Sequence, residues 1–143
     1  MATAIVTGAS SGIGEEFARR LAARHDVDDL WIVARRRNRL EQLASQLQDQ
    51  VRVRVVEADL TDQAALARIG ETLNRERPPI RFLVNNAGYG KNGVFGDSDL
   101  TDQLGMVDLN VRAVVDLTRR AAAFLEPGAK VINVASAAAY FPM

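Results

Sequence analysis

Short apolar runs recur along the chain and predict five β-strands. The first two, at residues 4–6 and 30–34, are continuous, which is typical of strands buried on both faces of a parallel sheet. The third, at 51–55, alternates valine with arginine, and this period of two predicts a half-exposed strand at a sheet edge. Runs at 80–84 and 130–135 complete the set.

Between these strands the apolar residues recur every third or fourth position, as on one face of an amphipathic helix. We expect Asp59-Leu60-Thr61 to cap the third helix and Pro127-Gly128 to end the fourth. The predicted helices are residues 14–24, a segment around Leu40, Leu43 and Leu47, a segment around Leu66, Ile69 and Leu73, and residues 101–125.

Strands and helices therefore alternate along a single domain of 143 residues. Since crossovers between parallel strands are right-handed, the pattern predicts an α/β fold, a doubly wound parallel sheet with helices on both faces. The expected strand order is 3-2-1-4-5. The switch point then lies between strands 1 and 4, where such sheets bind their ligands.

Composition excludes several classes of function. Eighteen basic and eighteen acidic residues give a net charge of +0, so we expect no nucleic-acid partner and no membrane partner. The chain has no cysteine and one histidine, His25, which argues against a metal site; we read His25 as a solvated loop residue. No apolar run is long enough to cross a membrane, and Met1 leads directly into the first strand, so the expected location is cytoplasmic.

The turn after the first strand carries the clearest chemical signal. Gly8, Gly12 and Gly14 lie between that strand and the first helix, and Ser10 and Ser11 add hydroxyl groups. A helix N-terminus offers free N–H groups and partial positive charge, and glycines let a phosphate approach the backbone closely. The alternative is that the glycines only shape a strand-to-helix turn.

The string T-G-A-S-S-G-I-G, which includes Ile13, resembles the cofactor loop of the classical short-chain dehydrogenase/reductase family. The resemblance implies a Rossmann-type domain that binds a nicotinamide dinucleotide. It also implies a longer domain, with a seven-stranded sheet, of which this chain covers about the first half. The sheet would then be truncated after its fifth strand.

The end of the second strand predicts which dinucleotide is bound. NAD-binding versions of this architecture carry an acidic residue about 20 positions after the glycines, where it binds the ribose hydroxyls. Here Ala34 and Arg35 occupy that place, and a guanidinium suits the 2′-phosphate of NADP. We therefore predict NADP as cofactor, with Arg35 as main phosphate ligand and Arg36 assisting. For Arg37 and Arg39 a solvated helix start is the preferred reading.

Two further segments match cofactor-binding elements of the family. Asp59 and Leu60 follow the third strand, where the resemblance places an aspartate against the adenine amino group; a helix N-cap is the alternative. Asn86, Ala87 and Gly88 belong to an N-N-A-G element after the fourth strand. Small residues there let the backbone pass close to the cofactor ribose.

The resemblance assigns catalytic roles to Asn110 and Ser136. Asn110 is a polar residue within the predicted fourth helix, where asparagine is a poor helix former, and in the family it helps to hold a water of the proton relay. Ser136 stands where the family's serine binds the substrate carbonyl or hydroxyl. The family's Tyr-x-x-x-Lys pair has no counterpart in the sequence, and Tyr140 has no lysine four positions later.

Two functions follow as hypotheses. The first is an NADP-dependent oxidoreductase that moves hydride between nicotinamide and a small-molecule carbonyl or alcohol, with this chain inactive alone because it lacks a general acid–base. The second is a non-catalytic NADP-binding module, a sensor or partner protein. We also expect a homo-oligomer, because Val107, Val111, Val114 and Val115 leave an apolar helix face uncovered.

Overall fold

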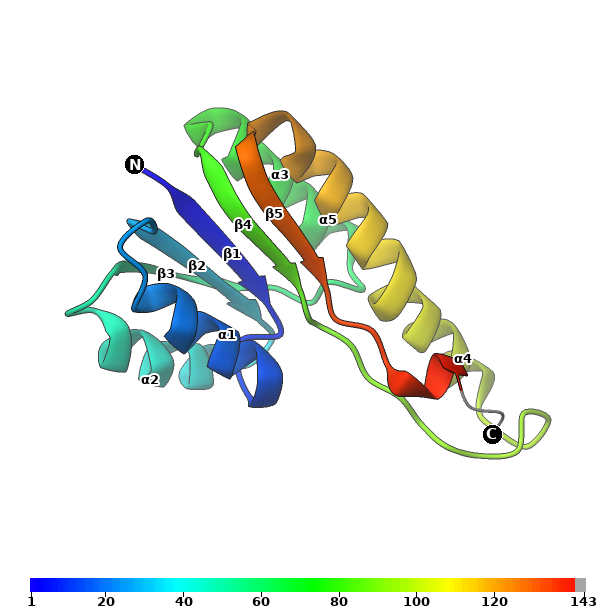
Figure 1. Cartoon of the computed structure of the whole chain (residues 1–143). Helices are drawn as coiled ribbons and strands as arrows, with labels where there is room; N and C mark the ends of the chain where they lie inside the picture. The colour runs from blue at the N-terminus through cyan, green and yellow to red at the C-terminus, as the bar shows by residue number, and fades with distance from the viewer. Residues whose placement is uncertain (141–143) are drawn as a thin grey trace.

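The computed structural model describes residues 1–140 and shows one twisted, five-stranded sheet (Figure 1). All neighbouring strands are parallel, and their order is β3-β2-β1-β4-β5. The predicted α/β class, strand order and edge position of the third strand are therefore confirmed. The strands are β1 (Thr3–Thr7), β2 (Asp29–Ala34), β3 (Arg52–Glu57), β4 (Ile80–Asn85) and β5 (Leu125–Asn133).

The helices form two layers, one on each face of the sheet (Figure 1). The first layer consists of α1 (Gly12–Ala22) and α2 (Arg37–Leu47), and the second of α3 (Gln63–Glu76) and α5 (Ala113–Ala121). Helix α4 (Leu100–Val107) continues into α5 through a π-helical turn, η1 (Asp108–Arg112). Two 3₁₀ turns follow, η2 (Ala122–Phe124) and η3 (Ala137–Tyr140).

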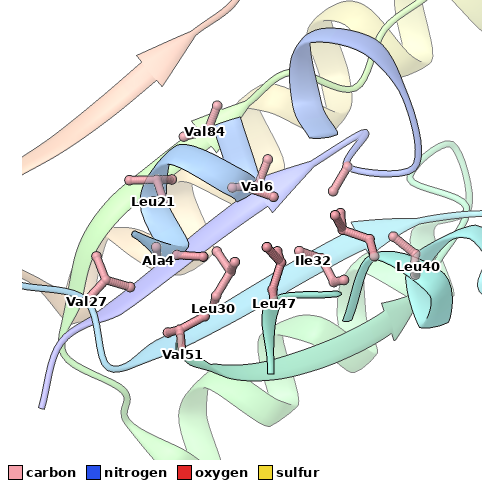
Figure 2. Packing of buried hydrophobic residues seen from close by; sticks show 14 of the residues in the cluster. Ala4, Val6, Leu21, Val27, Leu30, Ile32, Leu40, Leu47, Val51 and Val84 are labelled. Carbon is pink, nitrogen blue, oxygen red and sulfur yellow. The ribbon is translucent and has the colours of Figure 1, made fainter. Parts of the chain in front are cut away.

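The alternation of side chains along β1 builds two separate cores. Ala4 and Val6 face α1 and α2, and Figure 2 shows them packed with residues of β2 such as Leu30 and Ile32. Ile5 points to the other face and packs against α3 and α5. Because β1 and β2 are buried at every position, both faces are covered at the centre of the sheet, and the carboxyl ends of these strands are held rigidly.

Three predicted boundaries were wrong at the C-terminal end of the chain: the end of the long helix and both ends of the fifth strand. The long helix ends at η2, before Leu125, and Pro127-Gly128 lies inside β5 and not at the helix end. The strand tolerates this pair because its pairing with β4 shifts register between Ile80 and Phe82, and Gly128 adopts a φ of 82°. β5 therefore begins at Leu125, before the predicted start at Lys130, and ends at Asn133, before the predicted end at Ala135.

None of the helices among residues 1–140 has the length and apolar character needed to cross a bilayer.

Candidate active site

The glycine turn lies at the carboxyl end of β1, beside the ends of β2 and β4, and its backbone is closely packed against β4. A Cβ atom on Gly14 would lie 2.3 Å from the carbonyl oxygen of Gly8 and 2.4 Å from Nδ2 of Asn86. Gly8 adopts a φ of 66°, which favours glycine, and a Cβ there would also contact Asn86. Gly12 also has a positive φ, 58°, but open space lies beyond its Cα.

Asn86 and Thr7 tie the turn to β4. The amide Nδ2 of Asn86 donates to the carbonyl oxygens of Thr7 at 3.0 Å and Gly8 at 3.4 Å. The hydroxyl of Thr7 accepts from the backbone N–H groups of Asn86 and Ala87, each at 3.0 Å, and donates to the carbonyl of Val84 at 3.3 Å. The two chain segments that flank the switch point therefore form one hydrogen-bonded unit. Thr7 was not among the residues singled out from the sequence.

Arg36, at the start of α2, reaches across to the glycine turn. Its Nη2 donates to the hydroxyl oxygens of Ser10 at 3.0 Å and Ser11 at 2.8 Å, and its Nε lies 3.3 Å from the Ser10 hydroxyl. Ser11 is the N-cap residue of α1, yet its side chain makes no capping hydrogen bond. The guanidinium of Arg36 and the positive end of α1 thus lie together, and among the described residues no carboxylate binds that guanidinium.

These features fit the phosphates of a dinucleotide. The space beyond Gly12 is open, and Ile13 in the first turn of α1 is 61% exposed. Backbone N–H groups at a helix N-terminus, an absent Cβ and a nearby guanidinium are the groups that bind phosphate in such sheets.

Arg35 lies on the other side of the β2 end, toward Asp59. Burial raises the pKa of Asp59, but hydrogen bonds from Thr61 and the charge of Arg35 outweigh it, so the pKa lies below its ordinary value. Oδ1 of Asp59 accepts from the N–H of Thr61 at 2.9 Å and from its hydroxyl at 2.7 Å. Leu60, the next residue, is buried.

The predicted capping of α3 by Asp59-Leu60-Thr61 was wrong. The N-cap residue is Asp62, whose Oδ1 accepts from the N–H of Ala64 at 2.9 Å. Asp59 instead closes a tight turn on Thr61, which keeps its carboxylate beyond the end of β3.

Asn110 clamps the segment that follows Gly88. Its Oδ1 accepts from the backbone N–H of Tyr89 at 3.0 Å, and its Nδ2 donates to the carbonyl of Tyr89 at 2.8 Å. A Cβ on Gly88 would lie 3.0 Å from the same Oδ1, so glycine lets the two segments approach. Asn110 lies in the π-helical turn, which the sequence did not predict. A helix interrupted this way is frequent at functional sites.

Ser136 follows β5 at the same end of the sheet, in an exposed position. The strand before it is fixed to β4 by Asn85, whose Nδ2 donates to Oδ1 of Asn133 at 2.8 Å and to the hydroxyl of Thr118 at 2.9 Å. The carbonyl of Asn85 also accepts from the N–H of Val134 at 3.0 Å. Asn85 is the first residue of the N-N-A-G element, but its partners Thr118 and Asn133 were not foreseen from the sequence, because they lie far along the chain. The contact between Tyr89 and Asn110 was not foreseen either.

Other groups stay outside this arrangement. His25 is exposed in the loop before β2, as predicted. Tyr140 lies in η3 and is 88% exposed. Within the part of the chain that the structure describes, no cluster of three His, Cys, Asp or Glu side chains could hold a metal ion.

The sequence pattern of the family described as "short chain dehydrogenase" matches residues 2–143. The chain belongs to this family. The short-chain dehydrogenases are oxidoreductases, and the parallel sheet described above, with its order β3-β2-β1-β4-β5, matches the fold of solved relatives.

Similar proteins include enzymes from several organisms. Sulfoacetaldehyde reductase 2 of Chromohalobacter salexigens is 33% identical over 96% of this chain and 56% of its own length. A short-chain dehydrogenase from Sphingobium yanoikuyae, solved in complex with NADPH, is 39% identical with a TM-score of 0.78, over 86% of this chain and 48% of that one. A blue fluorescent protein from a metagenomic library, also solved with NADPH, is 33% identical with a TM-score of 0.87, over 97% and 57%. The chain thus spans about half the length of these relatives.

Proposed function

We propose that this short-chain dehydrogenase binds NADP(H) and provides the cofactor half of an enzyme that reduces a carbonyl or oxidises an alcohol. The observation that carries the proposal is the position of Arg36. It stands where β2 ends, in hydrogen-bond contact with Ser10 and Ser11 of the glycine turn. NADPH in the two solved relatives supports the choice of cofactor.

Electrostatics favours a phosphate on the ribose over a free hydroxyl. Within residues 1–140, the side chain of Arg36 donates to neutral hydroxyl oxygens and forms no ion pair, so its charge stays available to an anion. A guanidinium can give a phosphate two parallel charge-assisted hydrogen bonds. Arg35 lies near an acidic group instead, since its charge helps to lower the pKa of Asp59. In this proposal Arg36 therefore contributes more than Arg35, the reverse of the ranking expected from the sequence.

The remaining cofactor contacts are assigned from the site geometry and the family resemblance. The pyrophosphate would lie over the N-terminus of α1, next to Gly12 and Ile13. Asp59 would accept from the adenine amino group through the oxygen that Thr61 leaves free. Ala87 and Gly88 would border the nicotinamide ribose. Thr7 holds the N–H of Ala87, and Asn110 holds the backbone of Tyr89, the residue after Gly88.

When bound, the cofactor supplies or accepts the hydride. Ser136 would hold the substrate oxygen by a hydrogen bond, and Asn110 would keep the loop after Gly88 in place. The proton of the reaction needs a general acid–base, and the family's Tyr-x-x-x-Lys pair has no match in the printed sequence. We therefore propose that these 143 residues alone do not turn over carbonyl substrates, and steady NADPH consumption with an aldehyde or ketone would contradict this.

A second function, a non-catalytic NADP-binding sensor or partner protein, uses the same contacts. It is favoured only by the missing Tyr-x-x-x-Lys pair. The two proposals differ in one result: a longer protein that contains this chain reduces carbonyls under the first, and binds NADPH without turnover under the second.

Single arginine variants test the cofactor proposal. Arg36→Ala should weaken NADPH binding by about tenfold or more, roughly 1.4 kcal/mol, and leave NADH binding unchanged. Arg35→Ala should have a smaller effect, and Arg39→Ala, two positions into α2, should have none. Titrations followed by nucleotide fluorescence measure all three. Unchanged NADPH affinity in Arg36→Ala would refute the assignment.

A further inference from the structure

The loop between β4 and α4 contains the dipeptide Asn92-Gly93. Both residues are exposed, and the backbone there is neither helix nor strand. Within residues 1–140, no hydrogen bond holds the side chain of Asn92 or the N–H of Gly93. Glycine lacks the Cβ that would hinder approach of its backbone nitrogen to the preceding side chain, and it moves freely in φ and ψ.

We propose that Asn92 is a site of spontaneous deamidation. The backbone nitrogen of Gly93 attacks Cγ of Asn92, a C–N bond forms, and the bond from Cγ to Nδ2 breaks. Ammonia leaves, carrying away the proton that Gly93 gives up, and a cyclic succinimide remains. Water then opens the ring at either carbonyl, yielding aspartate or isoaspartate. No oxidant or cofactor is needed.

Asn92 and Gly93 lie between two residues that are held by hydrogen bonds, Lys91 and Val94. Ring closure therefore requires a change of conformation only between these two residues. On one side, the N–H of Lys91 lies 3.3 Å from Sδ of Met106, and its Nζ pairs with Asp102 at 2.5 Å. On the other side, the carbonyl of Val94 accepts from the N–H of Ser98 at 3.0 Å and from its hydroxyl at 2.8 Å. Asn92 and Gly93 lie between these anchors, and within residues 1–140 no hydrogen bond of the Asn92 side chain or the Gly93 N–H has to break for the ring to close.

Two exposed asparagines that lie on helices serve as internal controls for deamidation at Asn92. Asn38 lies in α2 and Asn74 in α3, and each is followed by an arginine. Helical backbone keeps the next nitrogen in the hydrogen-bonded ladder and away from the side chain. All three asparagines are exposed to solvent, but we expect deamidation at Asn92 and none at Asn38 or Asn74.

The product would alter the loop in two ways. A new carboxylate joins Asp97, Asp99 and Asp102 around a hollow of about 290 Å³ beside α4, where Lys91 is the one basic lining residue. Isoaspartate also adds a methylene to the main chain between the two anchors. The tip that carries Val94 and Phe95, 70% and 83% exposed, would then shift relative to α4.

Mass spectrometry of tryptic peptides after incubation of the folded chain at mildly alkaline pH tests the proposal. We expect conversion at Asn92, with both aspartate and isoaspartate products, at a rate within about tenfold of a free peptide of residues 89–99, which is about 1.4 kcal/mol in activation free energy. Asn92→Gln, which would have to close a larger ring, should abolish the modification without unfolding the chain. Deamidation of the peptide with an intact Asn92 in the folded chain would overturn the proposal, as would equal conversion at Asn74.

Discussion

The side-chain amide of Asn86 donates to the backbone carbonyl of Thr7 at 3.0 Å and so joins β4 to the residue before the glycine turn. Two motifs that are separated by almost eighty positions in the sequence thus share one set of hydrogen bonds. These hydrogen bonds, made within the protein itself, hold the turn in shape. Such preorganisation lowers the ordering cost of binding.

Gly14→Ala should disrupt this arrangement. The added methyl would lie 2.3 Å from a backbone oxygen of Gly8, which cannot move aside as a side chain can. Overpacking of this kind costs about 1–3 kcal/mol of folding free energy, and the shifted turn should also lose NADPH affinity. Gly90→Ala is the matched control, because open space surrounds that position. Urea unfolding and NADPH titration would measure both effects; wild-type behaviour of Gly14→Ala would show that the packing is not required.

Asn110→Ala should loosen the segment after Gly88. The change removes two hydrogen bonds to the backbone of Tyr89, each worth about 0.5–1.5 kcal/mol. Amide hydrogen exchange of Tyr89 should accelerate, while exchange in β1 stays unchanged. Asn74→Ala, exposed on α3, provides the control for loss of an asparagine from a helix. Equal protection of Tyr89 in wild type and Asn110→Ala would contradict the clamp.

The carboxylate of Asp59 should titrate below its ordinary pKa. Burial raises that pKa, but the hydrogen bonds from Thr61 and the charge of Arg35 lower it further than burial raises it. Because the folded-state pKa is lowered, the stabilisation is present above the unfolded pKa and is lost as pH falls through the folded one. Carbon NMR of the carboxyl group would follow the titration. Thr61→Val should raise the pKa of Asp59. Thr72→Val is the control and should leave that pKa unchanged, because the hydroxyl of Thr72 donates to the backbone carbonyl of Arg68.

The uncovered face of α4, η1 and α5 should drive self-association. Four apolar side chains at helical spacing are 54–65% exposed on this face: Leu104, Val107, Val111 and Val115. The sequence predicted this exposure for the three valines. It also predicted Val114 to be uncovered, but that side chain is half-buried. Contiguous apolar surface of this kind favours contact with a second copy. Light scattering should show association that Val111→Asp abolishes and Gln48→Asp, on the exposed end of α2, does not. A monodisperse wild-type monomer at high concentration would exclude it.

The sequence correctly predicted those strands and helices in which the spacing of apolar residues follows the spacing of buried positions. β1 and β2 are buried at every position, so their continuous apolar runs left one interpretation, and the leucines of α2 at 40, 43 and 47 are all buried. The end of the long helix was mispredicted because Pro127-Gly128 usually stops a helix. Here the chain already forms β5 before these two residues. The register shift in the pairing of β5 with β4 accommodates Pro127 and Gly128 within the strand.

The site was predictable where a motif is contiguous in sequence. The glycine turn and the N-N-A-G element were found at once, whereas the hydrogen bonds of Thr7 and Asn85 depend on strand register. Which of Arg35 and Arg36 contacts the glycine turn was also beyond sequence reasoning. Adjacent residues at a strand end point to different sides, and only the backbone direction decides which one meets Ser10.

The central claim is that the corner between the glycine turn and the end of β2 selects the 2′-phosphate of NADP. Isothermal titration of the wild-type chain with NADPH and NADH in the same buffer tests it most directly. We predict that NADPH binds at least about tenfold more tightly, because charge-assisted hydrogen bonds are worth about 1.5–3 kcal/mol. Equal affinity for the two nucleotides, or tighter binding of NADH, would contradict the account.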